Sequence, residues 1–153
     1  MCSSDLPQVV VPALAWRARG LATRRDPEGD AAATELLSIC RRLPGRVVDA
    51  WAVDAAIALS ALARSAGFDE LAEIKVSTPW LEATVALARG DYASAAETFM
   101  AMGAATCEAE ARLLGAREGL DVDLAAAIEF FRTVDATAYL REAEDLFARS
   151  RSA

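Results

Sequence analysis

The sequence predicts an all-α fold of stacked antiparallel helical hairpins, with about eight to nine helices in all. Alanine, the best helix former, is the commonest apolar residue, and runs of strand-forming residues are almost absent. Short segments with one apolar face alternate with turns that contain glycine. We expect residues 1–4 to be a loose tail and the 153-residue chain to form one helical-repeat domain, residues 1–153.

The first helix is expected at about residues 6–24. Asp5 can cap its N-terminus through the side-chain oxygen, and Trp16 and Leu21 are its large apolar side chains. Because Pro12 has no backbone N–H to donate, it should kink this helix or mark its true start.

Two further helices follow in the first half of the chain. One is expected at about residues 31–43, with Asp30 as its N-cap and Gly45 just beyond its end. The next, at about residues 47–66, should end at Gly67. It is apolar over much of its circumference, which is typical of a helix at the centre of a fold.

The clearest hairpin pattern lies at residues 79–102. Thr78 is the expected N-cap of its first helix, with Pro79 at the first helical position. Gly90 ends that helix because glycine tolerates left-handed dihedrals, and Asp91 can cap the helix that follows. So short a connection predicts that the two helices pack antiparallel.

This pattern recurs along the second half of the chain. Ala95-Ala96-Glu97 with Phe99 matches Ala127-Ile128-Glu129 with Phe131, and Glu110-Ala111 with Leu114 matches Glu142-Ala143 with Leu146. Both matches have the same offset in sequence, from Ala95 to Ala127 and from Glu110 to Glu142. A two-helix period of roughly 30–35 residues is typical of tetratricopeptide repeats (TPRs), so the expected fold is a TPR-like α–α superhelix. The alternative is a helical bundle whose alanine-rich sequence resembles itself by chance.

The best-matching repeats span residues 79–134, and a last helix is expected at residues 137–150. One side of this helix is apolar, and the opposite side carries Arg141, Glu142, Glu144 and Asp145. A half-polar terminal helix is what a stack of hairpins needs to cover its exposed end.

Composition limits the functions that the chain could have. The net charge is −7, from 16 basic and 23 acidic residues, and residues 77–153 carry 7 basic and 13 acidic side chains. Such a chain repels phosphate, so a nucleic-acid partner is not expected. No apolar run approaches the roughly 20 residues of a membrane span. With three widely spaced cysteines and no visible secretion signal, we expect a reduced, cytoplasmic protein.

The residues that usually carry chemistry are missing from the sequence. There is no histidine, which removes the commonest general base and metal ligand. The three cysteines form no close pair for zinc, and Lys75, the one lysine, is far from any glycine-rich turn. We therefore expect no enzyme activity, no catalytic residue, no cofactor and no metal.

Two stretches resemble a known class of proteins. WLEATVALARGDYASAAETFMAMG and AAAIEFFRTVDATAYLREAEDLF are similar to the C-terminal helical-repeat regions of large actinobacterial-type signalling proteins, which join cyclase or regulatory and ATPase domains to a TPR-like array. The resemblance covers about residues 76–150 and implies stacked helical hairpins with a role in protein interaction or regulation. Asp135 stands where that family usually has glycine.

The leading functional hypothesis is a non-catalytic protein–protein interaction or regulatory module of TPR-like type, which could be the C-terminal part of a multidomain signalling regulator. Its partner would be a protein or peptide of unknown identity, bound on the concave face that stacked first helices create. The charged residues expected on that surface are Glu82, Arg89, Glu110 and Arg117.

Two alternatives come from other functional classes. The chain could be a homo-oligomerisation unit, in which the half-covered ends of the stack pair with a second copy to form a homodimer. It could also be a small-molecule-sensing helical domain with a pocket near Trp16 and Trp51.

Overall fold

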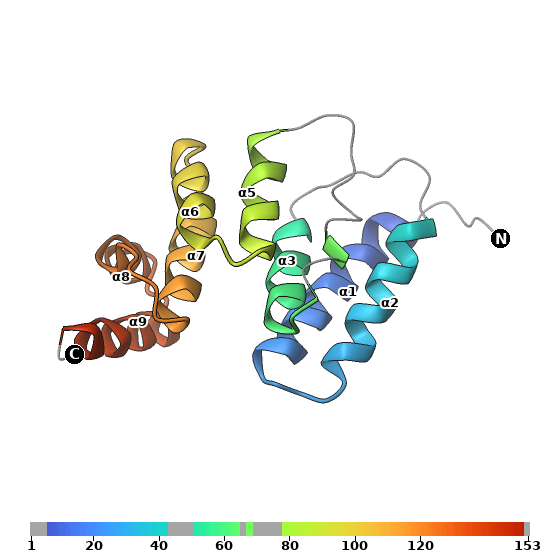
Figure 1. Cartoon of the computed structure of the whole chain (residues 1–153), viewed down its shortest axis with the longest axis horizontal. Helices are drawn as coiled ribbons and strands as arrows, with labels where there is room; N and C mark the ends of the chain where they lie inside the picture. Colours follow the sequence, from blue (N-terminus) through green and yellow to red (C-terminus); the bar gives the residue numbers. More distant parts are fainter. Residues whose placement is uncertain (1–5, 43–50, 65–66, 69–77, 152–153) are drawn as a thin grey trace. The chain divides into compact units, whose positions relative to one another are not determined.

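The computed structural model describes residues 6–42, 51–64, 67–68 and 78–151, with side chains described from residue 9 on. These residues form eight bounded helices and no strand, which confirms the all-α prediction. The chain divides into two compact units, residues 1–89 and residues 90–153, and Figure 1 shows the helices of both. The expectation of a single domain stays a prediction.

The described part of the first unit contains four helices, α1 (Leu6–Thr23), α2 (Gly29–Arg42), α3 (Trp51–Ala61) and α5 (Pro79–Ala88). Helix α1 packs against both α2 and α3, and α5 packs against α3 (Figure 1). The contact of α1 with its neighbours is built mainly from small buried residues: Ala18, Leu21, Ala22, Ala32 and Ala58. Alanine side chains allow the helix backbones to approach closely in this cluster, and larger side chains such as Leu36, Leu59 and Phe68 are buried elsewhere in the unit.

An ion pair and hydrogen bonds also connect the helices of the first unit. The guanidinium of Arg19 on α1 meets the carboxylate of Asp54 on α3 at 2.6 Å. Arg64, which follows α3, donates to the first two turns of α2: to the Asp30 carbonyl at 3.0 Å and the Thr34 hydroxyl at 2.8 Å. These contacts join segments that are far apart in sequence.

The structure corrects the expected start of the second helix. Asp30 lies inside the first turn of α2 and is not its N-cap. The carboxylate of Asp26 instead accepts from the backbone N–H of Glu28 at 2.9 Å, just before the helix begins at Gly29. Helix α1 runs through Pro12 without a break, so Pro12 does not mark its start.

The end of the third helix also differs from expectation. Helix α3 ends at Ala61, and Ala63 takes a left-handed conformation with φ of 54°. The next backbone N–H, of Arg64, donates to the carbonyl of Leu59, so the last turn closes at an alanine and Gly67 does not end the helix. Gly45 and the expected start of this helix lie outside the described residues.

The local signals around the 79–102 hairpin are confirmed. The Thr78 hydroxyl accepts from the N–H of Leu81 at 3.2 Å, with Pro79 at the first helical position. Gly90 has a left-handed φ of 79°, and the Asp91 carboxylate caps the next helix. The two helices of this hairpin belong to different units, so their expected antiparallel pairing stays a prediction.

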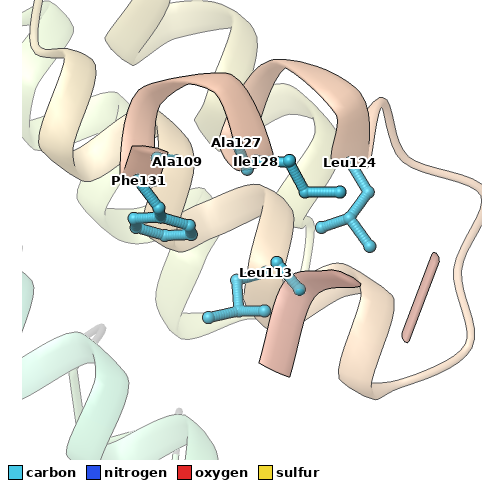
Figure 2. Packing of buried hydrophobic residues seen from close by; sticks show 7 residues of the cluster. Ala109, Leu113, Leu124, Ala127, Ile128 and Phe131 are labelled. Atoms are coloured by element: carbon cyan, nitrogen blue, oxygen red, sulfur yellow. The ribbon is translucent and has the colours of Figure 1, made fainter. Parts of the chain in front are cut away.

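The second unit contains, among its described residues, α6 (Tyr92–Ala101), α7 (Ala105–Arg117), α8 (Leu124–Thr133) and α9 (Thr137–Ser150). Each of these helices packs against the next one along the chain, and α7 also packs against α9. Figure 2 shows the core between α7 and α8, where Ala109 and Leu113 meet Leu124, Ala127, Ile128 and Phe131. Ala143 brings α9 into the same cluster.

The helix pair α8–α9 repeats the pair α6–α7 at a constant offset in sequence. Helices α6 and α8 start at Tyr92 and Leu124 and end at Ala101 and Thr133, so both bounds differ by the same number of positions. The starts of α7 at Ala105 and α9 at Thr137 differ by that number too. We call residues related by this offset equivalent. The capping residues Asp91 and Asp123 are equivalent, and each accepts from a backbone N–H three residues on. Gly103 and Asp135 are also equivalent, with left-handed φ values of 72° and 54°.

The buried positions follow the same offset. Ala95 and Ala127, Phe99 and Phe131, and Ala111 and Ala143 are equivalent pairs in which both members are buried. The match seen in the sequence is therefore also a match in helix bounds, caps, turn conformation and core positions.

Candidate interaction surface

The structure places the four expected surface residues in two pairs. Glu82 is exposed in the first turn of α5, and Arg89 is the exposed C-cap of the same helix, in the first unit. Glu110 is half-buried in α7 and Arg117 is the exposed last residue of that helix, in the second unit. Within α7 the spacing of seven positions puts Glu110 and Arg117 on one face.

Arg117 contacts α9 through two hydrogen bonds. Its Nε donates to Oε1 of Glu142 at 2.7 Å, and its Nη2 donates to Oε2 of the same carboxylate at 2.9 Å. This two-bond geometry is the strongest form of an arginine–carboxylate contact. Arg117 therefore joins α9 to α7, a role that sequence reasoning did not assign to it.

The ion pair shifts the ionisation of both groups. The hydrogen bond from Arg117 holds the pKa of the Glu142 carboxyl below its ordinary value, against a smaller opposing effect of burial. The same hydrogen bond raises the pKa of Arg117 above its ordinary value. Both groups therefore stay charged at neutral pH.

A sequence signal for this contact existed. Glu142 is equivalent to Glu110, and Arg149 is equivalent to Arg117. The same spacing of glutamate and arginine thus occurs on α7 and on α9. The arginine of the earlier helix reaches the glutamate of the later one, which only the packing of α7 on α9 reveals.

Four equivalent pairs of positions form what we call the α7/α9 face. They lie at matching register on the two helices and are half-buried or exposed: Cys107 with Tyr139, Glu110 with Glu142, Leu114 with Leu146, and Arg117 with Arg149. Within each helix these positions share one side because they are spaced by three or four positions. The face alternates apolar and charged groups, which suits recognition of a peptide segment.

A second ion pair on α7 is more enclosed than its sequence spacing suggests. Glu108 and Arg112 are four positions apart, the spacing of an ion pair on a helix surface, and the Nε of Arg112 donates to Oε1 of Glu108 at 3.0 Å. Their side chains are only 17% and 12% exposed. Splitting so enclosed a pair would leave a charge poorly solvated, so we treat this pair as part of the scaffold.

A tryptophan, a cysteine and the acidic residues are the other candidates for a small-molecule or metal site. Trp16 is 71% exposed on α1, so its side chain does not line an enclosed pocket with Trp51. Burial raises the pKa of the Cys40 thiol to about 11, which keeps it protonated and unreactive at neutral pH. Among the described residues no three Cys, Asp or Glu side chains gather closely enough to hold a metal ion.

Comparisons with other proteins leave the function open. No protein-family model, curated protein or solved structure matches the chain. Within the parts of the chain that the structure describes, no helix has both the length and the apolar character needed to cross a membrane.

Proposed function

We propose that residues 90–153 form a TPR-like repeat unit that acts as a non-catalytic protein–protein interaction module. The observation that carries the proposal is the structural repeat of α6–α7 in α8–α9, in helix bounds, capping aspartates and left-handed turn residues. Two-helix repeats of this length are typical of proteins that bind other proteins along stacked helices.

The packing order supports this proposal over a closed bundle. In a closed four-helix bundle the first helix packs along the fourth. Among the described helices of the second unit, the substantial contacts run from each helix to the next and from α7 to α9, and α6 with α9 is not among them. Contact between neighbouring repeats is the arrangement expected in an open stack.

Helix α9 has the features of the last helix of such a stack. Ala109 and Leu113 on α7 are buried against α8, whereas the equivalent positions on α9 carry Arg141 and Asp145, which are exposed. Another helix packed on these charges would have to desolvate them, so the outer face of α9 suits the last helix of a stack. The α7/α9 face is then the surface left for a partner.

Charge indicates the kind of partner. Residues 90–153 carry six arginines against twelve Asp and Glu residues, and Arg117 is already paired with Glu142. A basic peptide segment would be attracted to this unit, and the attraction would weaken as salt is added. The half-buried Leu114 and Leu146 offer apolar contact between the charged positions.

Affinity capture with matched charge variants tests the proposal. The full chain should retain a protein partner from native lysate at low salt. Glu110→Arg on the α7/α9 face should lose that partner, whereas Glu97→Arg, an identical charge change at an exposed position of α6, should keep it. Circular dichroism checks that both variants are folded. Failure to capture any partner, or an equal response of the two variants, would contradict the proposed surface.

The signalling role implied by the resemblance belongs to the same proposal. A regulator of that class would place a cyclase or ATPase reading frame directly beside the gene for this chain. Finding the gene among functions with no signalling or nucleotide chemistry would count against the regulatory part of the proposal and leave the interaction module untouched.

A further inference from the structure

Helix α1 carries an apolar stripe on the side that faces away from α2 and α3. Val9, Ala13, Trp16 and Gly20 are spaced by four, three and four positions, so they share one side of the helix. Val9 is 69% exposed and Trp16 is 71% exposed. We call these four residues the α1 stripe. Most large apolar side chains of the described first unit are buried, so the exposed indole of Trp16 stands out among them.

Gly20 leaves an empty space next to that indole. Glycine weakens the interior of a helix, so it usually has a packing reason. Gly115 on α7 has one, since a Cβ there would lie 2.8 Å from Cγ1 of Val122 and 3.2 Å from Cβ of Tyr92. At Gly20 no heavy atom of the described structure, apart from the adjoining backbone of α1, lies within 4 Å of that position. Nothing within the described chain uses the gap, which lies one turn along from Trp16.

We propose that the α1 stripe is a homodimer interface in which two copies of α1 pair antiparallel about a two-fold axis. With the axis midway between residues 16 and 20, Trp16 of each copy sits over Gly20 of the other. The two-fold rotation exchanges positions 16 and 20 between the copies, so the large side chain of each copy meets the glycine of the other. Ala13 then lies opposite Thr23 of the second copy, a position that is also exposed.

The charges along α1 favour the antiparallel arrangement. Its described residues from Val9 to Trp16 carry no charge, and the arginines lie in the second half of the helix. Parallel pairing would place every arginine against its own copy. About the proposed axis, Arg24 lies level with Pro12 of the second copy, and Arg17 lies level with Arg19, whose charge is neutralised within its own chain by Asp54 at 2.6 Å. Arg17 is also compensated within its own chain, by Glu28 at 3.7 Å and Glu35 at 3.6 Å.

Arg24 provides a further contact for an indole at this site. Its Nε donates to the carbonyl of Gly20 at 3.1 Å, which holds the guanidinium beside the gap. A tryptophan seated over Gly20 would meet this cation, and arginine interacts favourably with the face of an indole ring. The second copy supplies the indole because its own Trp16 is brought there by the two-fold axis.

The area of the interface sets the strength expected of the dimer. A buried tryptophan contributes roughly 150–250 Å². Two such residues and the small residues around them give an interface at the low end of the size range, below about 1,200 Å² in total. We therefore expect a reversible dimer that dissociates on dilution.

Sedimentation velocity of the full chain over a dilution series tests this interface. The wild type should shift from monomer to dimer as its concentration rises to the high micromolar range. Gly20→Gln fills the gap with a good helix former and should give a monomer that melts no lower than the wild type. Trp16→Ser should also be monomeric, and Met100→Gln, an exposed apolar position on α6, should dimerise normally.

The exchange variant that combines Trp16→Gly with Gly20→Trp separates this geometry from general stickiness. The two-fold axis relates positions 16 and 20, so exchanging the two residues rebuilds the same contact, and the double variant should regain the dimer that each single variant loses. A wild type that stays monomeric at every concentration would overturn the proposal. A dimer that survives Gly20→Gln would also overturn it, and so would a double variant that stays monomeric. Either result would mean that the copies associate through another surface.

Discussion

The two copies of the helical repeat, α6–α7 and α8–α9, share one backbone plan and differ on one outer face. Residues 91–117 and 123–149 have equivalent helices, capping aspartates and left-handed residues at the same positions along the repeat. On α7, however, Ala109 and Leu113 are buried against α8, and on α9 the equivalent Arg141 and Asp145 are exposed. Capping and turn residues therefore determine where the helices and turns lie. The residues on the outer face of the second helix determine whether another helix can pack on it.

The largest expected difference in the free energy of unfolding is between substitutions at equivalent positions of α7 and α9. Leu113→Ala should lower the free energy of unfolding by about 2–5 kcal/mol, because it leaves a cavity in the core that α8 covers. Asp145→Ala, at the equivalent exposed position, should change it by less than about 0.5 kcal/mol. Urea denaturation of the full chain measures both. Similar losses for the two variants would show that α9 is as enclosed as α7.

The next effect compares two glycines inside helices. Gly115→Ala should destabilise the second unit by about 1–3 kcal/mol, because the added methyl meets Val122 and the Cβ of Tyr92. Gly20→Ala should stabilise the chain by up to about 1 kcal/mol, since its Cβ meets nothing. Thermal melts of the two variants should shift in opposite directions. A shared direction would mean that packing around one of these glycines differs from the description above.

The sequence could predict features that depend on neighbouring residues. Thr78, Asp91 and Gly90 were assigned to helix ends because capping oxygens and left-handed dihedrals act within a few residues. The end of α3 at Ala61 was missed because the left-handed residue that follows it is Ala63, and alanine gives no signal for a left-handed turn. The N-cap assigned to Asp30 failed because several acids lie close together there, and spacing alone does not choose among them.

Features that depend on packing between distant residues were less accessible. Helix α1 is apolar on more than one side, so its periodicity did not show that Trp16 points outward. The site residues were only partly predictable for the same reason. Arg117 was expected on the surface, but its partner Glu142 lies far along the chain and is reached only through the packing of α9 on α7.

A smaller effect concerns the turn residue that differs between the copies. Gly103→Asp should cost about 1 kcal/mol, because a residue with a Cβ is strained by left-handed dihedrals. Asp135→Gly should be neutral or stabilise by up to about 1 kcal/mol, since relief of that strain is offset by the flexibility that glycine adds to the unfolded chain. Chemical denaturation of both variants provides the values, and a strong loss on Asp135→Gly would contradict the assigned turn.

The smallest effect concerns the ion pair between the copies. Because Arg117 lowers the pKa of Glu142, the pair stabilises the chain above the ordinary glutamate pKa and loses its contribution as pH falls through the lowered value. At neutral pH, Glu142→Gln should cost about 0.2–1 kcal/mol, since the pair is partly exposed. The difference in the free energy of unfolding between Glu142→Gln and the wild type should shrink in acid. A difference that grows in acid would contradict the sign of this coupling.

A crystal structure of the full chain tests the central claim most directly, through superposition of residues 92–117 on residues 124–149. We expect Phe99 to fall on Phe131, Ala111 on Ala143, and the left-handed Gly103 on a left-handed Asp135, with Arg117 bound to Glu142. A structure in which α6 packs along α9 in a closed bundle, or in which Asp135 has a negative φ and the two segments do not superimpose, would contradict the repeat.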